Sequence, residues 1–284
     1  MRKILRNVQF IIGVRTNQVS MVKKSLLNGA DINYCVMQGK SALYMVIERR
    51  NLDLLKTLIN HDVDVDFHKS NEYTPIEYAC IYGNAEIVKK LVYAGCSLNY
   101  DKNEICQILA ARDRIHTLEF LIDKGMRPDQ QGWDGRTGLH WAVQEDHFRV
   151  VELLAERGAD MDVMEEDGQT PLRISCGEGN INITKYLLEN HAEVDLGVYD
   201  TPLQIASSMG YVKIVSLLLE FGAEVDWCDK DGRTALFYAK AHGQKKIEKM
   251  LKNHGADTGI IDRYGISIRD LDRKEMRKRV IWEI

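Results

Sequence analysis

Few residues of this chain have types and spacings that suggest catalysis or metal binding. The six cysteines, at positions 35, 80, 96, 106, 176 and 228, form no Cys-x-x-Cys pair, which argues against zinc and thioredoxin-like sites. Cys176, beside Gly177, is the strongest candidate nucleophile, and His140 and His147 are the strongest candidate metal pair. The chain has no Walker-type glycine loop, His-Glu-x-x-His motif or Gly-x-Ser-x-Gly elbow. We therefore expect a chain that is not an enzyme and binds no metal or cofactor.

Composition sets further bounds. Of 284 residues, 45% are hydrophobic and 28% charged, which is enough apolar material for a core. The net charge of -4 argues against a nucleic-acid partner, and no apolar run is long enough for a membrane span, so we expect no membrane partner. The first residues lack the long apolar core of a secretory signal. We expect a monomer with reduced cysteines in the cytoplasm, with the nucleus as a second location.

Two anchors recur along the sequence with one period. The first is Gly-Ala-Asp or a close variant, and its copies begin at positions 29, 62, 95, 125, 158, 191, 222 and 255. The steps between them are 33, 33, 30, 33, 33, 31 and 33 residues. The second anchor is Ser or Thr, at positions 41, 74, 137, 170, 201, 234 and 267. Two independent anchors on one period indicate a repeat architecture, which outweighs the two domains that the length alone suggests.

Each unit predicts a pair of helices. The Ser or Thr is typical of a helix N-cap, and proline follows it at positions 75, 171 and 202, where the first helical residue needs no N–H. A second helix has apolar residues on one face, as in Ile214, Leu217, Leu218 and Phe221. It ends at the glycine of the first anchor, in the left-handed conformation, and Asp62 and His191 replace that glycine twice.

This unit resembles the ankyrin repeat, most clearly at 134–142, 167–172 and 231–236. The resemblance covers nearly the whole chain and implies an all-α ankyrin-repeat solenoid of helix-turn-helix units with projecting β-hairpin-like fingers. It predicts a single domain, 1–284, in which a cap (1–33) and a second cap (259–284) enclose repeats at 34–66, 67–99, 100–129, 130–162, 163–195, 196–226 and 227–258. It also implies that His140 links neighbouring units and that Cys176 packs at the end of a first helix.

Some units depart from this pattern. The unit at 100–129 is three residues short and has Glu104-Ile105-Cys106-Gln107 in place of Thr-Pro-Leu-His. The unit at 196–226 lacks two residues of its finger, at 196–200. Each departure predicts a notch in the row of fingers. The basic run at 273–279 could contact RNA or an acidic partner, although a solvated cap helix is the favoured interpretation.

The resemblance implies protein recognition by the concave surface of finger tips and first helices. Counting from the Ser or Thr anchors places eight residues on that surface: Tyr73, Tyr82, Trp133, Arg136, Glu166, Asp167, Lys230 and Arg233. The first four flank the short finger, and Trp, Tyr and Arg are enriched at binding hot spots, so we expect them to form the centre of the site. The alternative is that Tyr73 and Trp133 pack between fingers.

Two functions remain open. The leading one is a non-catalytic intracellular scaffold or adaptor that binds a protein partner on the concave surface. The alternative is a host-directed ankyrin protein of a virus or intracellular bacterium that redirects host signalling or ubiquitination.

Overall fold

The computed structural model describes residues 2–35, 40–68, 73–99 and 104–272. These residues form sixteen α-helices and one short 3₁₀-helix, and their only β-type pairings are two isolated bridges, Cys35 to Ser41 and Ile261 to Ser267. The chain divides into two compact units, Met1–Gln130 and Gln131–Ile284. The predicted all-α repeat fold is confirmed, whereas its organisation as a single domain stays a prediction. Within the described residues no helix is long and apolar enough to cross a bilayer.

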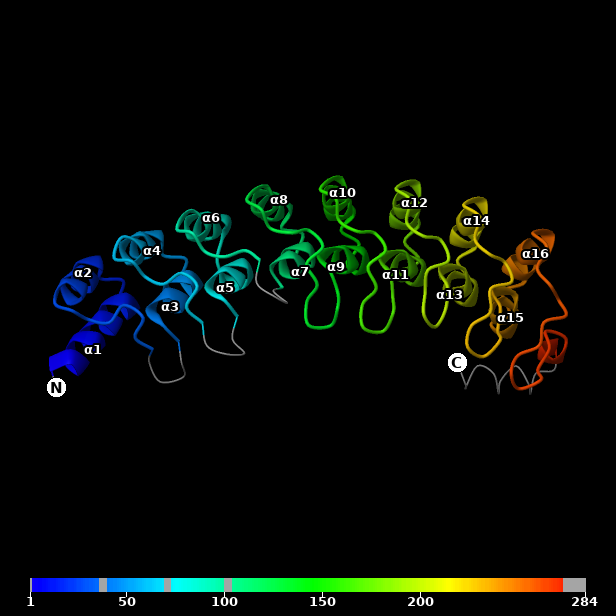
Figure 1. Ribbon diagram of the computed structural model, residues 1–284, viewed down its shortest axis with the longest axis horizontal. Helices are drawn as coiled ribbons and strands as arrows, with labels where there is room; N and C mark the ends of the chain where they lie inside the picture. The colour runs from blue at the N-terminus through cyan, green and yellow to red at the C-terminus, as the bar shows by residue number, and fades with distance from the viewer. Residues whose placement is uncertain (1, 36–39, 69–72, 100–103, 273–284) are drawn as a thin grey trace. The chain divides into compact units, whose positions relative to one another are not determined.

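Unit 1 contains four helix pairs. In each pair a first helix is followed closely by a second one, and in Figure 1 α3, α5 and α7 lie in one layer while α4, α6 and α8 lie in another. The pairs are α1 (Arg2–Arg15) with α2 (Val19–Leu27), α3 (Ala42–Glu48) with α4 (Leu52–Ile59), α5 (Pro75–Tyr82) with α6 (Ala85–Tyr93), and α7 (Ile105–Ala110) with α8 (Ile115–Asp123).

Unit 2 repeats the same plan, and its loops extend on the side of the first helices (Figure 1). Its pairs are α9 (Gly138–Gln144) with α10 (Phe148–Glu156), α11 (Pro171–Glu178) with α12 (Ile181–Glu189), α13 (Pro202–Met209) with α14 (Val212–Glu220), and α15 (Ala235–Ala241) with α16 (Lys245–Asn253). The 3₁₀-helix η1 (Asp270–Asp272) follows them.

Hydrogen bonds at the helix starts explain where the first helices begin. The threonine hydroxyl accepts a bond from the N–H of the third helical residue at Thr74, Thr170, Thr201 and Thr234, as expected of an N-cap. Ser41 makes no such bond, so the capping prediction is wrong there. The first helices then pack side by side within each unit, α3 on α5 and α11 on α13 among them.

Left-handed residues explain where the second helices end. The glycines of the first anchor have positive φ, and the two replacements follow them, with φ of 58° at Asp62 and 68° at His191. The N–H of the next residue turns back to the helix, as when Val63 donates to the carbonyl of Leu58 at 3.2 Å. The predicted helix ends are confirmed.

The core of each unit lies between its two helix layers. It includes Leu54 and Leu58 of α4 in unit 1 and Leu218 of α14 in unit 2, each completely buried.

All six cysteines are free thiols, and Cys176 is buried in the core. Burial raises the pKa of the Cys176 thiol to about 12, so the thiolate needed for nucleophilic attack is suppressed.

Candidate partner-binding surfaces

The third residue after the Ser or Thr anchor, or after Glu104 in its place, connects several helix pairs to the next loop. In unit 2, His140 is completely buried, and its Nδ1 lies 3.1 Å from the backbone N of Thr137, from which it accepts. Its Nε2 lies 3.2 Å from the carbonyl oxygen of Gln169 in the loop of the following repeat. Burial lowers the pKa of His140 to about 4, because the charged imidazolium is poorly solvated there. His140 therefore links neighbouring repeats, as the resemblance implied.

We call the side chain at this position the linking residue. Tyr44 donates to the carbonyl of Tyr73 at 2.7 Å, and Gln107 donates to the carbonyl of Gln130 at 2.8 Å. Gln204 most closely matches His140, since its amide oxygen accepts from Thr201 N at 2.9 Å and its amide nitrogen donates to the carbonyls of Trp227 and Arg233. Different side chains thus make the same connection, and they hold the loops in place as a rigid surface.

Backbone hydrogen bonds close the loops of unit 2. Gly132 N donates to Arg136 O at 2.9 Å, and equivalent bonds of 3.1, 3.1 and 2.9 Å close the loops at 165–169, 229–233 and 262–266. Successive loops also pair, because Glu166 N donates to Asp134 O at 3.1 Å and Arg263 N donates to Asp231 O at 2.8 Å.

The short loop at 196–200 adjoins a hollow in unit 2. A cavity of about 240 Å³ lies beside it, lined by residues of the short loop, α13 and the next loop: Tyr199, Asp200, Gln204, Ile205, Ser208, Asp229, Lys230, Asp231, Arg233 and Tyr238. Lys230 Nζ lies 5.2 Å from the ring centroid of Tyr199, and Arg173 makes two 2.9 Å bonds to the carboxylate of Asp200. The cavity lies at one predicted notch. The other, at 100–103, is outside the described residues.

A cluster of tyrosines lies on the first helices of unit 1. Tyr73 and Tyr82 are 46% and 45% exposed, and the Tyr82 ring lies 4.4 Å from that of Tyr78 between centroids. The Tyr78 ring in turn lies 5.1 Å from that of Tyr44, and Lys40 donates to the Tyr78 hydroxyl at 3.3 Å. Sequence reasoning missed Tyr78, although its position four residues before Tyr82 on one helix places the two rings on one face.

The predicted residues of unit 2 differ in exposure. Trp133 is 65% exposed, and Glu166, Asp167 and Lys230 are also exposed, which leaves all four available to a partner. The Arg136 side chain is only 19% exposed. It contacts Glu165 Oε2 at 3.4 Å and Gln144 Oε1 at 2.6 Å, and it covers the ring of Trp141. Because Tyr73 and Tyr82 belong to unit 1, a single site that joins them to Trp133 and Arg136 stays a prediction.

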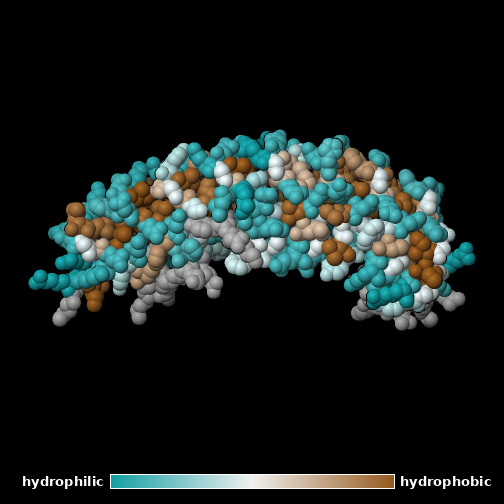
Figure 2. All heavy atoms as spheres, viewed as in Figure 1, coloured by the Kyte–Doolittle hydropathy of each residue, from teal (hydrophilic) through white to brown (hydrophobic). Residues whose placement is uncertain are grey.

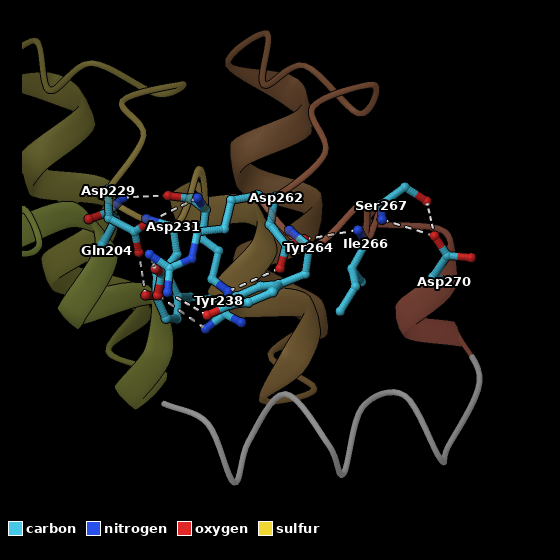
Figure 3. A network of polar contacts seen from close by, with 11 residues as sticks. Gln204, Asp229, Asp231, Tyr238, Asp262, Tyr264, Ile266, Ser267 and Asp270 are labelled. Atoms are coloured by element: carbon cyan, nitrogen blue, oxygen red, sulfur yellow. Dashed lines mark hydrogen bonds and ion pairs between the residues drawn. The ribbon is translucent and has the colours of Figure 1, made fainter.

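Arg233 corrects the prediction of an exposed finger residue. Its side chain is 1% exposed, and its Nε lies 3.3 Å from Asp262 Oδ2, whose side chain is completely buried. Figure 3 shows Asp262 in the polar network of this region, together with Asp231 and Tyr264. The guanidinium also lies over the rings of Phe237 and Tyr264, at 5.4 and 5.7 Å from their centroids. The residue before the anchor offers its carbonyl to close the loop, as Arg233 does for Asp229 N, and its side chain turns inward. Counting from the anchor did not distinguish this position from the exposed tip.

The described residues contain no group of three His, Cys, Asp or Glu side chains placed to hold a metal ion. The two histidines of the candidate metal pair also lie in different settings. Both ring nitrogens of His140 face protein atoms, whereas His147 lies at the start of α10.

Comparison with known proteins identifies the class of protein. A family model for ankyrin repeats, three copies, matches residues 10–103, 106–198 and 195–262. The chain belongs to the ankyrin-repeat family, whose members are generally non-catalytic interaction scaffolds.

Individual relatives match parts of the chain. Ankyrin repeat protein L371 of Acanthamoeba polyphaga mimivirus is 23% identical over 145 residues, which are 50% of this chain and 19% of that protein. Ankyrin repeat protein FPV244 of fowlpox virus is 28% identical over 132 residues, 46% of this chain and 20% of that protein. Alpha-latrotoxin-Lg1a of Latrodectus geometricus is 29% identical over 129 residues, 43% of this chain and 9% of that protein. The chain thus spans about a fifth or less of these relatives.

Proposed function

We propose that the chain is a non-catalytic scaffold or adaptor that binds a protein partner through its first helices and loops. The observation that carries this proposal is the tyrosine cluster of unit 1, in which the Tyr78 ring contacts those of Tyr44 and Tyr82 and the Tyr82 side chain is 45% exposed. Tyrosine presents a large apolar ring and a polar hydroxyl, and it loses little rotational freedom when it is buried against a partner.

The backbone around this cluster is held by arginines from the neighbouring pairs. Arg50 Nε donates to the carbonyl of Tyr82 at 3.0 Å, and Arg112 donates to the carbonyl of Ile81 at 2.9 Å. These bonds satisfy carbonyls at the end of α5 and fix the position of the rings. A surface that is already ordered loses less conformational entropy when a partner docks.

An alanine scan against the purified partner, identified by affinity capture and mass spectrometry, tests the tyrosine cluster. Tyr82→Ala is expected to weaken binding by about 2 kcal/mol, as for a hot spot. The control is Tyr93→Ala, since Tyr93 is 67% exposed on the second helix α6 of the same unit. Isothermal titration calorimetry should show full affinity for the control. Loss in Tyr93→Ala but not in Tyr82→Ala would place the partner on the other helix layer.

We propose that the exposed loop residues of unit 2 form a second binding surface, with Trp133 as the anchor and Glu166, Asp167 and Lys230 around it. Their exposure supports this role, whereas the burial of Arg233 removes that residue from the proposed site. Trp133→Ala should also weaken binding by about 2 kcal/mol. An unchanged affinity would contradict this role and would favour the alternative that Trp133 packs between loops.

The host-directed role remains the second candidate function, and relatives from mimivirus and fowlpox virus support it. The captured partner separates the two roles, because a ubiquitin-ligase component would favour redirection of host proteins.

We also propose a cytoplasmic or nuclear monomer without a nucleic-acid partner. The six free cysteines and the net charge of -4 support this, and cell fractionation with light scattering tests it.

A further inference from the structure

The outer face of α1 exposes an apolar stripe. Ile4, Leu5, Val8 and Ile12 are 64%, 60%, 42% and 45% exposed. Residues four apart on a helix lie on one face, so Ile4, Val8 and Ile12 form a continuous row with Leu5 beside it. Figure 2 shows apolar side chains at the surface of the end of unit 1 that α1 and α2 form.

This face differs from the other first helices of unit 1. Each of α3, α5 and α7 packs against the first helix before it, and the main packing partners of α1 are α2 and α3. The opposite face of α1 already fills the core, since Phe10 and Val14 are completely buried. An exposed row of large apolar side chains such as this one indicates a surface that contacts another apolar surface.

Positive charge surrounds the stripe. Residues 1–30 contain six basic side chains and no acidic one, while the remaining residues contain 32 basic and 42 acidic ones. Arg2 is one turn from Leu5, and Arg15 is one turn from Ile12, and both are exposed. Lys23 and Lys24 of α2 are exposed as well. The partner of this face must therefore accept apolar side chains and carry negative charge.

We propose that the outer face of α1 binds an anionic lipid membrane, with α1 lying in the interface. The combination of an exposed apolar row with arginines and lysines beside it is typical of a helix that lies in the plane of an anionic membrane surface. Anionic headgroups would then contact the arginines and lysines at the ends and side of the stripe. The expectation of no membrane partner rested on the lack of a spanning segment, which does not bear on a helix that lies at the membrane surface. This contact is separate from the tyrosine cluster.

Vesicle co-sedimentation of the full chain tests the proposal. Vesicles of phosphatidylcholine with about 30% phosphatidylserine should bind the protein in about 0.1 M salt, and pure phosphatidylcholine vesicles should not. Ile4→Asp should weaken binding roughly tenfold or more, because it removes an inserted side chain and adds a repelled charge. The matched control is Ile261→Asp, since Ile261 is 59% exposed in unit 2.

A second pair of variants tests the charge. Arg2→Glu with Lys3→Glu should abolish binding, whereas Lys245→Glu with Lys246→Glu, an equal change on exposed residues of α16, should leave it unchanged. Circular dichroism should show equal melting for all variants, because every changed side chain is exposed. The proposal is overturned by equal binding to neutral and anionic vesicles, by no binding, or by equal loss in either control. It is also overturned by a dimer in light scattering that Ile4→Asp dissociates, because a second copy would then cover the face.

Discussion

At the scale of single residues, the linking position shows how one buried side chain can make stability depend on pH. His140 and Gln204 occupy the same place in two repeats of unit 2 and contact equivalent atoms, a backbone N–H in their own repeat and a carbonyl in the next loop. Only the imidazole can take up a proton. Since the buried site disfavours the charged ring, protonation must oppose folding at His140.

We predict that the protein loses stability as the pH falls from about 6.5 to about 4. In that window the unfolded chain binds a proton at His140 and the folded chain does not. The free energy of unfolding should therefore fall by about 3 kcal/mol once the pH is below the folded pKa of about 4. His140→Gln should remove this pH-dependent loss of stability, because glutamine takes up no proton, and it should keep the hydrogen bond to the next loop. Urea unfolding at several pH values measures it, with exposed His116→Gln as the control. An unchanged pH dependence in His140→Gln would contradict the assignment.

The buried ion pair of Arg233 gives a second prediction at this scale. Arg233→Ala leaves the fully buried carboxylate of Asp262 without its guanidinium, and we expect a loss of about 3–5 kcal/mol in the free energy of unfolding. Arg263, whose side chain is 54% exposed, pairs with Asp231 at 3.0 Å in the same region. Arg263→Ala should cost much less, because solvent screens the attraction of an exposed pair. Chemical denaturation of both variants distinguishes the buried pair from the exposed one, and equal losses would contradict the difference.

At the scale of the helices, the repeat depends on where each element stops. Gly95 has a φ of +88° after α6, and a side chain there would meet no atom within 4 Å. Its role is therefore conformational and not steric. Gly177, by contrast, lies inside α11, where an added methyl group would lie 3.6 Å from Ile205 Cγ1, an ordinary contact.

Alanine at these two glycines should change stability in opposite directions. Gly95→Ala is expected to destabilise the protein by about 1 kcal/mol, since a β-carbon disfavours the left-handed conformation. Gly177→Ala should stabilise it by up to about 1 kcal/mol, because alanine has the higher helix propensity. Thermal melting measures both, and a stable Gly95→Ala variant would show that α6 can end without a left-handed residue.

The sequence predicted most helix boundaries because their signals are local. A threonine that accepts an N–H, a proline after it and a left-handed residue at the end each act within a few residues. Ser41 failed as a cap although it occupies the same register, and its hydroxyl makes no capping bond. Glu104 replaces the threonine before α7 and provides no side-chain cap either.

At the scale of the whole molecule, local stability should follow the quality of the helix pairs. Helix α7 has six residues and no side-chain cap, whereas α5 has eight residues, a proline at its first position and a capping box between Thr74 and Glu77. Short uncapped helices open more easily because few bonds hold them.

Native-state hydrogen exchange should therefore find faster exchange in α7 than in α5. Mass spectrometry of peptides from both helices at one pH measures the difference. A protection factor for α7 equal to that of α5 would contradict the prediction and would show that packing alone determines the protection of these helices.

The candidate surfaces were less predictable than the fold. The 33-residue period predicts which residues are near a loop, but not which way each side chain turns. Arg233 was expected at an exposed tip and lies under Tyr264, and Tyr78 was not expected and lies between Tyr44 and Tyr82. Both outcomes depend on aromatic side chains of a neighbouring repeat, which the sequence of a single repeat does not contain.

The linking residues have one further consequence for how this chain can change over generations. Tyr44, Gln107 and Gln204 each donate to a main-chain carbonyl of the following loop. A carbonyl is present whatever amino acid occupies the position. Substitutions at exposed loop tips can therefore accumulate without loosening the joint between repeats, and such a protein can acquire new binding preferences while its architecture is inherited intact.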